Sequence, residues 1–224
     1  MFKLKEVRYL PTEVRVKTEE GKPKRATGSG LVYGQRSQNL GGQKWPFYEI
    51  IEAGAFAQSV RQANDGERVI KSYFNHDPNQ VLATTRSNPP LTVLDTDEGV
   101  FYDAEIPDTS YGRDLEINLE RRNVEGSSFS FEVTADEWEE ADDGTVTRTI
   151  KEGIMYELGP VTDPAYLQTS ATARSAEDAY KEFRAKSQED EARKQQADEE
   201  QRQARQKEAE RRERDLKLKE MELI

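Results

Sequence analysis

The last fifty residues constrain the fold most, because they contain no glycine, no proline and few apolar side chains. From Ser175 to Ile224 the chain is almost entirely Glu, Asp, Lys, Arg, Gln and Ala, whereas most aromatic and aliphatic residues lie before about Tyr166. A segment of this composition cannot bury a hydrophobic core of its own. We therefore predict one folded domain over residues 1–173 and a charged extension over residues 174–224.

The charged extension has two interpretations. Ser175 is a good helix N-cap, acidic residues follow it in the first turn, and helix propensity is high throughout. Pairs four residues apart, such as Glu189 and Arg193, support a solvated single helix, but no coiled-coil heptad is sustained. The extension is either a flexible charged tail or a helix that docks on a partner.

Composition excludes several function classes. The net charge of −11 argues against nucleic acid as a partner, because affinity for a duplex comes from cations that neutralise phosphates. No apolar run approaches the roughly 20 residues that span a bilayer, so we expect no membrane partner. The absence of cysteine suits a reducing cytoplasm. With one histidine and no cysteine, only carboxylates are left to bind a metal. Asp95 and Asp97 read more simply as an acidic turn, so we expect no metal and no cofactor.

The first 173 residues read as many short strands with two or three helices, which favours an α+β fold or an all-β barrel. The predicted strands alternate apolar and polar residues between turn signals such as Asn88–Pro90. Helices are predicted over residues 53–63 and 109–122. Strands are predicted within 2–18 (two pieces) and over 28–34, 47–51, 69–74, 81–82, 91–94, 100–104, 127–134, 145–150 and 154–158.

His76 is the only histidine, and it directly follows the predicted strand 69–74. Imidazole is the side chain whose unperturbed pKa lies nearest neutrality, so it is the natural general base. If the chain is a serine hydrolase, His76 must be the base that activates the serine. The alternative is an exposed turn histidine without a catalytic role.

The predicted strand 127–134 carries the candidate nucleophiles. Alternation places Phe129 and Phe131 on one face and Ser128, Ser130 and Glu132 on the other. A strand with an aromatic core face and a serine-bearing opposite face suits the presentation of a nucleophile, although many edge strands look the same.

A serine–histidine pair is usually oriented by a third group. With no second histidine in the chain, that group must be an acid or an amide. Glu157 lies among apolar strand residues, where a carboxylate needs a partner, and His76 could be that partner. Glu152, in a predicted Lys-Glu-Gly turn, is more easily solvated.

Five sequence blocks in a fixed order resemble the prohead (capsid maturation) protease family of tailed bacteriophages, in particular members from lambdoid phages with cross-linked capsids. That family is similar in fold to the herpesvirus assemblins. The resemblance spans about residues 1–173. The blocks are Phe47–Phe56, Asn75–Asp77 followed by Val81–Thr84, Gly99–Phe101, Ser127–Phe131 and Tyr156–Tyr166.

The resemblance implies roles for three residues. The family's histidine block places its base at His76, its serine block begins at Ser128, and its acidic block places the third member at Glu157. Ser130 stands where the family has glycine, which leaves two serines on one face and makes Ser130 an alternative nucleophile.

The resemblance also implies a mainly antiparallel small β-barrel with surrounding helices. The implied activity is that of a serine endopeptidase that cleaves the major capsid protein, including its scaffold-like segment, and itself, inside the procapsid in the host cytoplasm. The charged extension would then bind the scaffold-like segment. The alternative is a non-enzymatic capsid assembly or scaffolding protein in which the same residues are structural.

Overall fold

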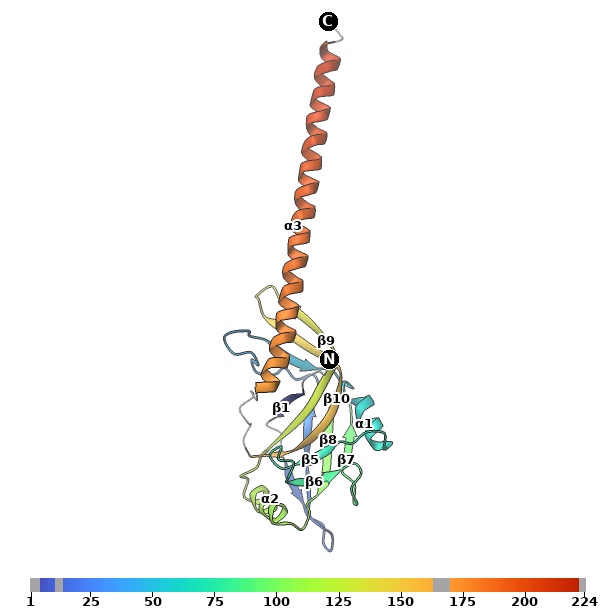
Figure 1. Ribbon diagram of the computed structural model, residues 1–224, viewed down its shortest axis with the longest axis vertical. Coiled ribbons are helices and arrows are strands. Elements are labelled where there is room, and N and C mark those ends of the chain that lie inside the picture. The colour runs from blue at the N-terminus through green and yellow to red at the C-terminus, as the bar shows by residue number, and fades with distance from the viewer. Residues whose placement is uncertain (1–4, 11–13, 163–169, 222–224) are drawn as a thin grey trace. The chain divides into compact units, whose positions relative to one another are not determined.

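The computed structural model describes residues 5–10, 14–162 and 170–221. The chain divides into two compact units, Met1–Asp178 and Ala179–Ile224. The first unit contains all the described strands (Figure 1). Residues 2–4 and 11–13 of the predicted strands, and the end of the last sequence block from residue 163, lie outside the described residues.

The described residues form ten strands and three helices. The helices are α1 (Ala57–Asn64), α2 (Ser110–Glu120) and α3 (Ser170–Met221). The strands are β1 (Glu6–Leu10), β2 (Arg15–Lys17), β3 (Arg25–Val32), β4 (Tyr48–Ile51), β5 (Lys71–Tyr73), β6 (Val81–Thr84), β7 (Thr92–Asp95), β8 (Gly99–Glu105), β9 (Gly126–Glu140) and β10 (Val146–Val161).

The larger sheet is organised around the long hairpin β9–β10. Its strand order is β1-β9-β10-β5-β6, and β4 also pairs with β10. Strand β10 pairs antiparallel with β9, and it pairs in parallel first with β4, at 147–150, and then with β5, at Glu157. Strand β5 is therefore brought to the C-terminal half of β10, opposite the start of β9.

The smaller sheet is antiparallel, in the order β2-β3-β8-β7. Together the two sheets and the helices make a mixed α+β fold with mainly antiparallel pairing, as the sequence predicts. The expected barrel does not form as one closed sheet among the described residues: the end strands of the larger sheet, β1 and β6, do not pair with each other, and neither do β2 and β7 of the smaller sheet. The alternation of apolar and polar residues predicts where strands lie, but it does not determine which strand edges pair.

The core beneath strand β9 is aromatic. Phe129 and Phe131 are fully buried, and their rings lie 5.1 Å apart. The ring of Phe56 packs edge-on against both, at 6.2 and 5.5 Å. A Cβ at Gly153 would lie 2.5 Å from the Phe56 ring, so this glycine allows the aromatic cluster to lie against β10. The cluster fixes which face of β9 points into the core.

The structure corrects several sequence predictions of element boundaries. Strand β9 continues to Glu140, beyond the predicted end at residue 134. Helix α3 begins at Ser170, so Ser175 lies within the helix and is not its N-cap. The predicted strands 145–150 and 154–158 are one strand, β10, whose register shifts near Glu152 where a turn was expected. A β-bulge absorbs the extra residue there without ending the strand. Helix α1 begins at Ala57 instead of residue 53, because Gly54 has φ +80°, a left-handed conformation that a helix cannot contain.

Helix α3 spans 52 residues and continues to Met221. Its charged side chains from Lys186 to Arg212 are exposed. Pairs four residues apart include Arg212 and Glu208, whose Nη2 and Oε1 atoms lie 2.6 Å apart. Among the described helices, none has both the length and the apolar character that crossing a bilayer requires.

Candidate active site

Strand β9 presents the predicted nucleophile. Residues 126–131 are all buried, with the phenylalanines on the core face and Ser128 and Ser130 on the opposite face. The backbone of Ser128 pairs with Tyr9 of β1 and with Gly159 of β10. The serine is therefore held in the interior of a three-stranded ladder, and its position is set by backbone pairing on both sides.

Close approach of β5 to β10 brings the histidine to the serine. A Cβ at Gly159 would lie 2.4 Å from the Tyr73 carbonyl oxygen and 3.1 Å from the Ser72 hydroxyl. Only glycine allows this separation, because the Cβ of any other residue would push β5 away from β10. Gly159 lies opposite Ser128 in the ladder, so the contact is made beside the predicted nucleophile.

The turn after β5 aims His76 at the site. Asn75 and His76 have φ values of +53° and +59°, which L-residues adopt only when their surroundings stabilise them. The Asn75 amide N–H donates to the Pro160 carbonyl at 3.0 Å, and the Asn75 side-chain oxygen accepts from the Thr162 amide at 2.8 Å. The end of β10 thus fastens the strained turn.

The three predicted site residues meet in one hydrogen-bonded chain. His76 Nε2 lies 2.6 Å from Ser128 Oγ, and His76 Nδ1 lies 2.8 Å from Glu157 Oε1. The side chains of His76 and Glu157 are 24% and 11% exposed, so solvent reaches the imidazole edge while the carboxylate is mostly covered. When Nδ1–H donates to Glu157, Nε2 is free to accept the serine proton.

Ser130 contacts the acid and not the imidazole. Its hydroxyl donates to Glu157 Oε2 at a longer 3.4 Å. The two serines on one face therefore occupy different places: Ser128 is beside His76, and Ser130 is beside Glu157. The second candidate acid, Glu152, is exposed at the register shift of β10, opposite Ala135.

Sequence reasoning missed the residues that bring the three groups together. Asn75 stands in the quoted histidine block, but its left-handed backbone and its bonds to Pro160 and Thr162 depend on a strand that lies far along the sequence. Gly159 follows Glu157 by two residues. A glycine within a β-strand often marks a place where another backbone approaches closely, so this residue was a signal in the sequence.

The residues that the structure describes contain no group of three His, Cys, Asp or Glu side chains that could hold a metal ion. Asp95 of the acidic turn accepts a hydrogen bond from the Tyr33 hydroxyl at 2.5 Å. Burial raises the pKa of the Asp95 carboxyl, although the Tyr33 hydrogen bond opposes this. Asp95 therefore has a structural partner within the protein.

A hydroxyl, an imidazole and a carboxylate joined in this order form the arrangement that serine hydrolases use. The wider class follows from the sequence family. Residues 12–183 match the family model described as caudovirus prohead serine protease, and the chain belongs to this family. The family predicted from the five sequence blocks is thereby confirmed, and with it the general activity of a serine protease of bacteriophage capsid maturation.

Among solved structures, the capsid assembly protease of bacteriophage T4 matches with 14% sequence identity and a TM-score of 0.42. The match covers 70% of this chain and 98% of that chain. A search of curated proteins gives no match.

Proposed function

We propose that the chain is the endopeptidase that cleaves the major capsid protein within its scaffold-like segment, and that also cleaves itself, inside the procapsid in the host cell. Ser128 is the nucleophile, His76 the general base and Glu157 the group that orients the imidazole. One observation carries these roles: the contacts of 2.6 Å from His76 Nε2 to Ser128 Oγ and 2.8 Å from His76 Nδ1 to Glu157 Oε1.

The first half of the reaction acylates the enzyme. Nε2 of His76 takes the proton of Ser128 as Oγ attacks the carbonyl carbon of the scissile peptide. The C–N bond then breaks, and His76 returns the proton to the departing amine. Glu157 accepts from Nδ1–H throughout, which holds the productive tautomer and stabilises the imidazolium.

The second half releases the acyl group. A water molecule gives a proton to Nε2 while its oxygen attacks the ester carbon on Ser128. The ester C–O bond breaks, and the proton returns to Oγ. The same three side chains serve both halves, and no metal or cofactor enters any step.

Ser128 is preferred over Ser130 because of what each hydroxyl contacts. Ser128 lies beside the only imidazole of the chain, whereas the hydroxyl of Ser130 is directed at Glu157. In this proposal Ser130 helps to hold the acid and does not attack substrate.

Co-expression with the capsid protein tests the proposal. The expected result is processed capsid protein with wild type and with Ser130→Ala, and none with Ser128→Ala or His76→Ala. Removal of a triad member is expected to reduce the rate by about 10⁴-fold or more, with shell assembly unchanged. Full processing by Ser128→Ala would move the nucleophile to Ser130 or elsewhere.

The same experiment addresses self-cleavage and the competing scaffolding function. Fragments of the protease itself should appear with wild type and be absent with Ser128→Ala. A non-enzymatic assembly protein would leave the capsid protein intact in every case. That alternative accounts for the exposed charged helix α3, but it gives no reason for the hydrogen-bonded chain at Ser128.

The charged extension over residues 174–224 is proposed to dock on the scaffold-like segment of the capsid protein. The exposed charged side chains of α3 between Lys186 and Arg212 support a polar partner. A chain shortened after Asp178 should cleave a capsid peptide in solution but fail to enter proheads. Normal incorporation of the shortened chain would refute the docking role.

A further inference from the structure

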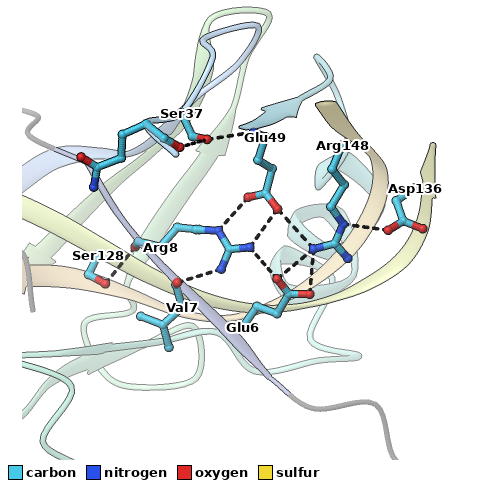
Figure 2. Close-up of polar contacts among 9 residues, drawn as sticks. Glu6, Val7, Arg8, Ser37, Glu49, Ser128, Asp136 and Arg148 are labelled. Carbon is cyan, nitrogen blue, oxygen red and sulfur yellow. Dashed lines mark hydrogen bonds and ion pairs between the residues drawn. The ribbon is translucent and has the colours of Figure 1, made fainter. Parts of the chain in front are cut away.

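The Ser128 hydroxyl has two acceptors within reach. Besides the contact with His76 Nε2, Ser128 Oγ donates to the main-chain carbonyl oxygen of Arg8 at 2.9 Å (Figure 2). A carbonyl oxygen can only accept, and the Nε2 of a neutral imidazole whose Nδ1 carries the proton also only accepts. Because a serine hydroxyl has one proton, it can serve only one of them at a time.

The second acceptor belongs to strand β1. This strand ends the larger sheet, and among the described residues its ladder partners lie on β9 alone, where Arg8 pairs with Phe129. An end strand held on one side has less backbone support than a central one. What fixes the Arg8 carbonyl must therefore include the side chains of β1.

A buried group of four charged residues, Glu6, Arg8, Glu49 and Arg148, anchors β1 to β4 and β10. We call it the β1 cluster (Figure 2). Arg8 bonds both carboxylate oxygens of Glu49, at 2.7 and 2.8 Å, and Glu6 at 2.5 Å. Arg148 bonds Glu6 at 3.0 Å and Glu49 at 3.2 Å. All four side chains are at most 8% exposed.

The charges of the β1 cluster hold one another ionised. Burial alone would raise the pKa of the Glu6 carboxyl, but Arg8 and Arg148 together lower it below its ordinary value. Burial acts to lower the pKa of Arg8, and the carboxylates of Glu49 and Glu6 more than reverse this. An ion pair this buried is costly to open, since each separated partner becomes an uncompensated charge.

We propose that the Arg8 carbonyl is the resting acceptor for the nucleophile's proton, and that the β1 cluster holds it there and thereby slows acylation of Ser128. The inference rests on the proposed role of Ser128. The bond from Ser128 to Arg8 exists in the resting enzyme and is lost when the proton passes to His76. An interaction made in the ground state and absent from the transition state lowers the rate.

The proposal predicts a gain of activity when β1 is loosened. A neutral hydrogen bond that no longer has to be broken corresponds to an acceleration of about two- to tenfold. A purely structural role of β1 predicts the opposite, because a loosened fold loses activity.

A matched pair of acid-to-amide variants tests this prediction in the full chain. Glu6→Gln weakens the β1 cluster on β1 itself. Glu137→Gln makes the same acid-to-amide change on β9, where Glu137 pairs with Lys151, a residue outside the β1 cluster. The probe is a fluorophosphonate: Oγ forms a bond to phosphorus, the P–F bond breaks, and fluoride leaves as the serine proton passes to Nε2.

The measured quantity is the rate constant for labelling Ser128, mapped by peptide mass. Glu6→Gln should label about two to ten times faster than wild type, and Glu137→Gln at the wild-type rate. An unchanged or slower rate for Glu6→Gln, or equal acceleration in both variants, would overturn the proposal.

A backbone change covers the case in which Glu6→Gln does not fold. Replacing Tyr9 by its α-hydroxy acid turns the peptide bond after Arg8 into an ester, whose carbonyl is a weaker acceptor, and leaves every side chain in place. Faster labelling again supports the proposal, and an unchanged or slower rate overturns it. Failure of wild type to label at Ser128 would instead remove the proposed function, so the two outcomes are distinguishable.

Discussion

Charged residues serve opposite purposes in the two units of this chain. In the first unit the side chains of Glu6 and Arg148 are 1% and 3% exposed and bonded to each other. In α3, the side chains of Glu208 and Arg212 are 62% and 76% exposed and pair within one helix. The buried charges hold β1 beside Ser128, the proposed nucleophile, while the exposed charges solvate a helix without a core.

The difference teaches that charge density alone does not reveal what a charge does. A buried pair depends on each partner, because losing one leaves the other uncompensated. An exposed pair four residues apart contributes little and is readily replaced. Substitutions of one kind in the two units should therefore have very different effects.

The same arginine substitution in each unit gives the largest contrast. Arg148→Met should lower the free energy of unfolding of the first unit by about 3–5 kcal/mol, because Glu6 and Glu49 lose a buried partner. Arg212→Met should change helix stability by about 0.5 kcal/mol or less. Denaturant titration of both variants measures the contrast, and equal effects would break the distinction between buried and exposed charge.

A single methyl group sharpens the contrast at the site. Gly159→Ala should reduce capsid cleavage by about 100-fold, since a Cβ there meets the Tyr73 carbonyl and displaces the strand that carries His76. The control is Gln203→Ala on α3, an exposed position whose amide bonds only within the helix, to Glu199. Cleavage rates of the folded variants decide the matter; near-normal cleavage by Gly159→Ala would show that β5 can move without consequence.

Acid should act on the first unit through Glu6. Its folded pKa lies below the ordinary value of 4.5, so its contribution to stability is complete above pH 4.5 and is lost as the pH falls through the folded value. Wild type should therefore lose stability below pH 4.5, and the difference in unfolding free energy between wild type and Glu6→Gln should become smaller there. Unfolding titrations between pH 6 and pH 2, about the range over which such a group titrates, would reveal a constant gap if Glu6 did not contribute.

The smallest effect is expected from removing most of α3. A chain ending at Asp178 keeps the whole first unit, so its melting temperature and its labelling by a fluorophosphonate should match those of the full chain. Calorimetry and labelling rates check this. A large loss of either would mean that the second unit supports the fold or the chemistry of the first.

Sequence reasoning could predict the three residues of the candidate site because the proposed chemistry depends on residue types that are scarce in this chain. A single imidazole leaves no choice of base, and alternation in β9 separates the serines from the phenylalanines. The residues alone offer two candidates for the third group, Glu152 and Glu157. In the structure Glu157 is the one that contacts His76. The family blocks supplied the order of the three residues.

What the sequence could not give are the long-range pairings. That β1 lies beside β9, and that Arg8 meets Glu49 and Arg148, depends on strand order, which alternation does not encode. The sequence predicts two strands in place of the continuous β10, because the Lys-Glu-Gly sequence around Glu152 suits a turn as well as a β-bulge. The prediction of a closed barrel is wrong because tertiary packing, which alternation does not encode, determines which strand edges pair.

Mapping of a fluorophosphonate adduct tests the central claim most directly. The account predicts one phosphonylated residue, Ser128, in the full chain, with no adduct in His76→Ala and with Ser128 still the labelled residue in Ser130→Ala. An adduct on another residue, or labelling of Ser128 that persists without His76, would contradict it.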